Sequence, residues 1–124
     1  MNEKRPKHLD LFLIRLPLPG WVSILHRASG MLLFLALPLL LWILQYSLRS
    51  IETWTMLADM LRHPLGKLFL IAMLWAFLHH LCAGIRYLAM DMDFGVNLAQ
   101  ARASGIWVLI VSLALTLLLG ARIW

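Results

Sequence analysis

The chain of 124 residues is 62% hydrophobic and only 14% charged, with a mean hydropathy of +0.82. These proportions lie far outside the range of soluble globular domains and indicate an integral membrane protein. The net charge of +5 does not indicate nucleic-acid binding, because the basic residues mostly flank apolar segments, where they set membrane orientation. The single cysteine, Cys82, excludes an intramolecular disulfide and a thiolate cluster for zinc or iron–sulfur binding.

The segment from residue 9 to residue 18 is apolar but too short to span a bilayer, and Arg15 interrupts it. We expect this segment to lie along the membrane interface. The Pro-Leu-Pro-Gly sequence at 17–20 predicts a turn that directs the chain into the membrane. The basic N-terminus is not followed by a small-residue cleavage site, so a removable signal peptide is not expected.

Three later segments are apolar and long enough to cross a membrane: residues 28–48, 65–90 and 106–121. The first, of about 21 residues, would be about 31 Å long, which matches a hydrocarbon core of about 30 Å. Pro38 in its middle predicts a kink. The expected fold is an all-α membrane protein, a single membrane-anchor domain over 1–124 with three transmembrane helices plus short interfacial helices. Because three helices make a poor independent bundle in lipid, we expect half of a two-subunit helical bundle.

Residues 49–63 predict a second interfacial helix. Their apolar positions recur at helical spacing, opposite Glu52, Asp59 and Arg62. Ser50 is the expected N-cap, and Pro64 suits the first position of the helix that follows.

Basic residues are distributed unevenly between the two sides that three spans would define. Seven lie on the side of the N-terminus and four on the opposite side. The positive-inside rule therefore predicts a cytoplasmic N-terminus and a C-terminus outside. Arg86, one of the seven, is expected with Asp91 and Asp93 at a cytoplasmic rim, either as a solvated helix end or as a docking surface for a cytoplasmic partner.

Four residues at the cytoplasmic start of the first span share one helical face: Ser23, His26, Arg27 and Gly30. Their spacing predicts that a hydroxyl, an imidazole and a guanidinium point the same way at the interface. One interpretation is a polar pocket that binds a carbonyl or a carboxylate. The other is a snorkelling arginine beside a serine N-cap.

Two adjacent histidines, His79 and His80, lie inside the second span. Ionisable side chains at bilayer depth are costly and usually mark a site. Each could be a hydrogen-bond bridge between helices, a proton relay or a metal ligand, including an axial ligand of haem iron. Periodicity does not choose between them, because His80 shares a face with Gly84 and Asp91, and His79 shares one with Arg86.

Depth along the helices argues against a haem site completed within this chain. His80 lies eleven residues before Asp91, about 16 Å from the cytoplasmic end of its helix, whereas His26 is expected in the first turns of the first span. Two axial nitrogens on one iron lie about 4 Å apart. His26 is then too shallow to be the second ligand, although it and Arg27 could reach haem propionates. If a haem is ligated by two histidines here, the second must come from another polypeptide.

Two motifs carry a family resemblance. The residues SILHRASG at 23–30 and HLCAGIRYLAMD at 80–91, with three helices around them, resemble the cytochrome b subunit, the larger membrane anchor, of bacterial succinate dehydrogenase (respiratory complex II). The resemblance implies a four-subunit enzyme of the bacterial cytoplasmic (inner) membrane, with a flavoprotein, an iron–sulfur protein and two small membrane anchors. Such an enzyme oxidises succinate and reduces ubiquinone.

The resemblance also implies roles for particular residues. His80 would be one axial ligand of a b-type haem, and the second anchor would supply the other. Ser23 and Arg27 fall on the family's quinone-binding serine and arginine, and His26 falls on a residue near the haem propionates. Tyr87 departs from the pattern, in which a histidine follows Gly-Ile-Arg, so a propionate contact there is not implied, although a phenol can donate a hydrogen bond.

Two alternatives stay open from the sequence. One is a fumarate reductase anchor that runs the same chemistry towards menaquinol. The other is a haem-free structural or assembly protein in which His79 and His80 bridge helices. The sequence has no recognisable nucleophile–base pair, phosphate loop or dinucleotide-binding motif, so the chain alone is not expected to be a complete catalyst.

Overall fold

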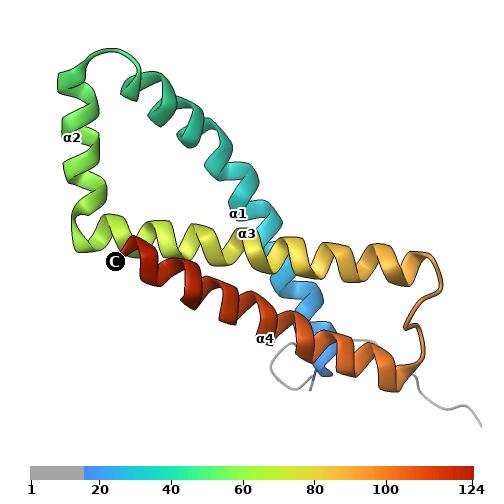
Figure 1. Ribbon diagram of the computed structural model, residues 1–124. Coiled ribbons are helices and arrows are strands. Elements are labelled where there is room, and N and C mark those ends of the chain that lie inside the picture. The colour runs from blue at the N-terminus through green and yellow to red at the C-terminus, as the bar shows by residue number, and fades with distance from the viewer. Residues whose placement is uncertain (1–15) are drawn as a thin grey trace, which may run out of the picture.

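The computed structural model describes residues 16–124, and over this range the chain forms helices and no strands (Figure 1). The helices are α1 (Leu18–Ser47), α2 (Ile51–Arg62), α3 (Pro64–Asp91) and α4 (Leu98–Ile123). Three of them, α1, α3 and α4, are long and apolar enough to cross a membrane, which confirms the expected all-α membrane fold. Residues 9–15 of the expected N-terminal interfacial segment lie outside the described residues.

The long helices extend beyond the expected spans. α1 begins at Leu18 with Pro17 as its N-cap, so the turn predicted at 17–20 is wrong. Proline is tolerated in the first helical turn because its missing N–H would have no partner there. α1 also continues as a helix through Pro38. α4 begins before the expected third span, where Asn97 Oδ1 accepts a hydrogen bond from the Gln100 N–H at 3.0 Å and caps the helix.

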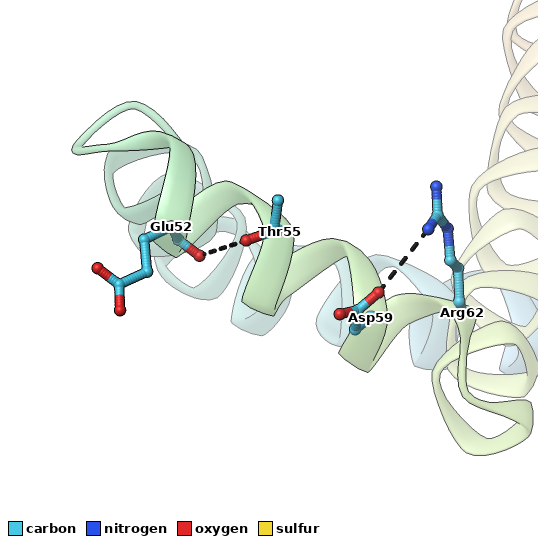
Figure 2. A network of polar contacts seen from close by, with 4 residues as sticks. All are labelled: Glu52, Thr55, Asp59 and Arg62. Atoms are coloured by element: carbon cyan, nitrogen blue, oxygen red, sulfur yellow. Dashed lines mark hydrogen bonds and ion pairs between the residues drawn. The ribbon is translucent and has the colours of Figure 1, made fainter.

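The short helix α2 is amphipathic, as predicted. Ser50 and Thr53 form a capping box, in which each side-chain oxygen accepts from the other residue's N–H at 3.1 Å. Figure 2 shows the polar face, with Glu52, Thr55, Asp59 and Arg62 along one side of the helix. The 3.7 Å ion pair between Arg62 and Asp59 is largely exposed and contributes little to stability. Leu57 is the buried apolar residue of α2.

The helices form an open, triangular frame (Figure 1). α3 and α4 run side by side in opposite directions, whereas α1 crosses α3 and then diverges from it. α2 joins the far end of α1 to the start of α3. The α3–α4 contact is close because the buried positions of α4 are mostly small. They are Ala101, Gly105, Val108, Ser112, Thr116 and Gly120.

The C-terminus of α3 is closed by main-chain hydrogen bonds. The N–H of Phe94 donates to the carbonyl of Ala89 at 3.0 Å, and the N–H of Asp93 donates to that of Met90 at 3.0 Å. This pattern is a Schellman motif, which places Asp93 in the left-handed region at φ 63°. Glycine is the usual residue at this position, and aspartate is one of the few side chains that tolerate it.

Much of the apolar surface of the long helices is exposed in the single chain. α1 in particular exposes Met31, Phe34, Leu35 and Leu41 at 64–71%. Exposed apolar side chains of this number require a cover of lipid or protein. The partner in a two-subunit bundle remains a prediction.

Candidate functional site

α1 and α3 cross at two histidines, His26 and His80. Their imidazole rings stack with centroids 4.2 Å apart and planes within 8° of parallel. A Cβ atom built on Gly30 would lie 2.8 Å from Cε1 of His80, and one built on Gly84 would lie 3.6 Å from Nε2 of His26. Each helix therefore contributes a His-x3-Gly unit, and each histidine packs against the glycine of the other helix.

Hydrogen bonds define the state of the His80 ring. Its Nδ1 lies 3.1 Å from the carbonyl oxygen of His26 and 3.3 Å from Oγ of Ser29. The Ser29 hydroxyl donates to the same carbonyl at 2.9 Å. Because a carbonyl oxygen only accepts hydrogen bonds, Nδ1 of His80 is the donor in this contact, and Nε2 is the nitrogen left to offer a lone pair. Among the described residues, Nε2 has no hydrogen-bond partner, and the ring is half-buried.

The neighbouring His79 is in a different environment. Its side chain is completely buried, and neither ring nitrogen has a hydrogen-bond partner within residues 16–124. The ring stacks against Trp75, with centroids 5.3 Å apart. Only His80 of the pair has a ring that an external group can reach.

The predicted difference in depth between His26 and His80 is wrong. α1 begins at Leu18, so His26 lies eight residues inside the helix, about 12 Å from its start, and the crossing brings it against His80. These two residues still cannot ligate one iron in this arrangement. In stacked rings the nitrogen lone pairs lie in parallel planes, whereas two axial ligands point their lone pairs at each other across the metal.

Arg86 is not part of a solvated rim, so that prediction is wrong. Its side chain is 7% exposed and turns towards the start of α4. There Nε donates to Oγ of Ser104 at 2.8 Å, and Nη2 donates to the carbonyl of Ala101 at 3.0 Å. Asp91 and Asp93 are exposed, as a solvated helix end predicts. The guanidinium of Arg86 instead connects α3 to α4 through these hydrogen bonds.

Tyr87 extends the aromatic cluster at the crossing. Its ring is tilted by 57° against that of His26, with centroids 5.2 Å apart, and the Arg86 guanidinium carbon lies 5.1 Å from the tyrosine centroid. The hydroxyl is buried and has no hydrogen-bond partner in the described chain. A buried hydroxyl without a partner is costly, so this phenol is a donor available to a group outside the described residues.

The polar face predicted on α1 is divided by the crossing. His26 packs against α3, whereas Arg27 is exposed and Ser23 is half-buried. Ser29 and the main-chain carbonyl of His26 are site groups that the sequence did not single out. The only sequence signal for them is the equal His-x3-Gly spacing in the two helices.

No metal site is completed within the described chain. Over residues 16–124, no three histidine, cysteine, aspartate or glutamate side chains lie close enough to hold an ion. A cavity of about 580 Å³ lies away from the crossing, between α1, α2 and α3, and is lined mainly by apolar side chains such as Trp42, Leu61 and Phe69. A cavity of this lining has few polar groups to orient a ligand.

Comparisons of the sequence with known proteins identify the family. Residues 1–119 match the family described as succinate dehydrogenase/fumarate reductase transmembrane subunit. The chain is 42% identical to the succinate dehydrogenase cytochrome b556 subunit of Coxiella burnetii over the full length of both. It is 34% identical to the protein of the same name from Rickettsia felis, over 94% of this chain and 90% of that one. It is 32% identical to the protein of the same name from Paracoccus denitrificans, over 83% of this chain and 78% of that one. The resemblance inferred from the two motifs is confirmed.

Proposed function

The chain belongs to the family of succinate dehydrogenase/fumarate reductase transmembrane subunits, and from this we propose that it is the haem b-binding membrane anchor of a succinate:quinone oxidoreductase. With three apolar helices it is a multi-pass membrane protein. We expect it in the bacterial cytoplasmic (inner) membrane, with the N-terminus in the cytoplasm and the C-terminus in the periplasm. This orientation follows from the excess of basic residues on the N-terminal side.

The observation that carries the haem proposal is the state of His80. A neutral imidazole with one nitrogen held by a carbonyl and the other free is the usual form of a metal-bound histidine. The contact of Nδ1 of His80 with the carbonyl of His26 at 3.1 Å supports this arrangement, because it holds one nitrogen and leaves Nε2 free. The half-buried ring of His80 is accessible, whereas that of His79 is completely buried. These residues fit a haem group, and His80 would be its axial ligand.

The remaining contacts to haem b would come from two sources. A second small membrane anchor would supply the other axial ligand, because His26 is stacked on His80 and cannot share its iron. His26 and the exposed Arg27 would contact the haem propionates, where a guanidinium pairs well with carboxylates. When bound, haem b supplies an iron that is reversibly reduced by one electron.

Ser23 and Arg27 would form this chain's part of the ubiquinone site. Ser23 is half-buried and Arg27 is exposed one turn later on α1. A hydroxyl and a guanidinium at this spacing can both donate to a quinone carbonyl oxygen. As electrons reach the quinone, Arg27 would stabilise the negative charge that builds on that oxygen.

The complete enzyme would need partners that this chain does not contain. An iron–sulfur subunit would deliver electrons, a flavoprotein subunit would oxidise succinate, and the lipid bilayer and second anchor would cover the apolar surface of the helices. The exposed face of α1 supports this proposal, because its large apolar side chains have no cover within the described chain.

An absorption spectrum of His80→Ala in the assembled complex tests the proposal. We expect this variant to lose the haem bands of the reduced-minus-oxidised spectrum and to keep dye-linked succinate oxidation. His79→Leu is the matched control and should keep the haem bands. A wild-type haem spectrum in His80→Ala would reject His80 as the ligand. Absence of haem from the wild-type complex would instead favour the haem-free anchor, and the extracted quinone and the reaction direction separate succinate dehydrogenase from fumarate reductase.

A further inference from the structure

We infer that Gly30 is a positioning residue for His80. By leaving room for the ring against α1, it sets which nitrogen of His80 carries the proton and which one is free to bind a metal. The inference rests on the proposed function only where it concerns haem, because the contacts themselves are formed within this chain.

Gly30 leaves room for the imidazole ring of His80. A Cβ atom there would lie 2.8 Å from Cε1 and 3.2 Å from Nδ1 of His80. The first distance is shorter than the contacts that real Cβ atoms make, so the imidazole would have to move. His80 is held by its own helix and by the stack with His26 at 4.2 Å. A ring displaced by this Cβ moves away from α1, the helix that carries the Cβ.

The hydrogen bonds at Nδ1 of His80 depend on the position of the ring. Movement away from α1 stretches the 3.1 Å bond to the His26 carbonyl and the 3.3 Å contact with Ser29. Both acceptors belong to α1, in the turn that precedes Gly30. Without them nothing in the described chain selects the tautomer with the proton on Nδ1. A bond from Nδ1–H to a carbonyl also makes Nε2 a stronger ligand, so its loss weakens binding of a metal at Nε2.

The second half of the crossing provides a matched control. Gly84 faces His26 as Gly30 faces His80, but a Cβ there would lie 3.6 Å from Nε2 of His26, an ordinary contact. Both glycines lie inside helices, so alanine brings the same gain in helix preference at each. A difference between Gly30→Ala and Gly84→Ala therefore reports the contact with His80 and not a general effect on the helix.

The experiment compares the two variants in the assembled, haem-loaded complex. We expect haem affinity to fall on the order of 10- to 100-fold in Gly30→Ala, as is usual when the group that orients a ligating histidine is lost. The reduction potential should rise, because a weaker donor stabilises ferric iron less. Gly84→Ala should retain haem at the wild-type potential. Equal haem affinity and equal reduction potential in Gly30→Ala and Gly84→Ala would overturn the inference.

A second measurement does not depend on haem. In the full-length chain labelled with ¹⁵N-histidine in detergent, NMR couplings report which ring nitrogen of His80 is protonated. We expect Nδ1–H in the wild type and in Gly84→Ala, and a shift towards Nε2–H in Gly30→Ala. An unchanged tautomer in Gly30→Ala would overturn the inference. If the tautomer shifts as expected but His80→Ala retains haem, the proposed function fails while the positioning role of Gly30 stands.

If Gly30→Ala does not assemble, Ser29→Ala tests the same contacts without added bulk. Ser29 is 3% exposed, and its hydroxyl is the second acceptor near Nδ1 of His80. Ser29→Ala should weaken haem retention, but less than Gly30→Ala, in which both contacts of Nδ1 are stretched. The 3.1 Å contact with the His26 carbonyl remains in Ser29→Ala, so Nδ1–H should persist. Haem retention identical to wild type would overturn the inference.

Discussion

The guanidinium of Arg86 donates from Nε to the hydroxyl of Ser104 at 2.8 Å, across the contact between α3 and α4. Its Nη2 also reaches the carbonyl of Ala101 at 3.0 Å. Both acceptors lie near the start of α4, where the chain re-enters the bundle after the turn that follows α3. A buried charge of this kind is stable only while its hydrogen bonds persist.

Replacement of Arg86 should therefore loosen the start of α4. We expect Arg86→Leu to destabilise the α3–α4 contact by about 1.5–3 kcal/mol, the range for hydrogen bonds to a charged group. Hydrogen exchange at the amides of the first turns of α4 measures this directly and should become faster. The exposed Arg102 on the same helix is the control, and Arg102→Leu should exchange as the wild type does. Equal exchange in both variants would show that the link has no energetic role.

His79 should be replaceable without loss of stability. Its two ring nitrogens are buried without hydrogen-bond partners in the described chain, and an unsatisfied buried polar group costs about 1–3 kcal/mol. An apolar residue of similar size removes this cost, so we expect the thermal inactivation temperature of the complex to stay the same or rise in His79→Leu. A clear decrease would show that His79 gains a partner in the assembled complex.

Arg27 should affect quinone reduction more than assembly. It is exposed and lies next to His26 on α1, so its removal leaves no buried group unpaired. We expect Arg27→Leu to lower the rate of succinate-dependent ubiquinone reduction by about 100-fold, the effect of losing a donor that stabilises developing charge. Dye-linked succinate oxidation should not change. The exposed Arg49, beyond the other end of α1, is the control, and quinone kinetics equal to those of Arg49→Leu would reject the assigned role.

Replacement of Asp93 by glycine should increase the stability of the protein. Its φ of 63° lies in the left-handed region, where a side chain costs about 1–2 kcal/mol, less for aspartate. Asp93→Gly removes this strain and keeps the Schellman hydrogen bonds, so the complex should tolerate more heat by an amount that corresponds to at most about 1 kcal/mol. Asp93→Val should do the opposite, because a β-branched residue is strongly disfavoured there. The two variants can be compared by thermal inactivation, and equal stability would contradict the conformational explanation.

Hydropathy and helical periodicity were sufficient to predict the helical class, the three long apolar helices and the amphipathic α2 with its Ser50 cap. These features depend on residues close together in the chain, so a single sequence contains them. The helix starts were less accurate. Pro19 and Gly20 were expected to form a turn, but the first turn of a helix tolerates both, and α1 begins at Leu18.

The sequence by itself determined that this is a membrane protein and, through the two His-containing motifs, which family it belongs to. Only the tertiary structure decided that His80 is accessible while His79 is buried, that His26 reaches His80, and that Arg86 binds α4 instead of solvent. Those outcomes depend on where helices cross, which residues far apart in sequence jointly determine. At this crossing the absence of a side chain at Gly30, where a Cβ would lie 2.8 Å from Cε1 of His80, lets α1 and α3 approach closely enough for the histidines to stack.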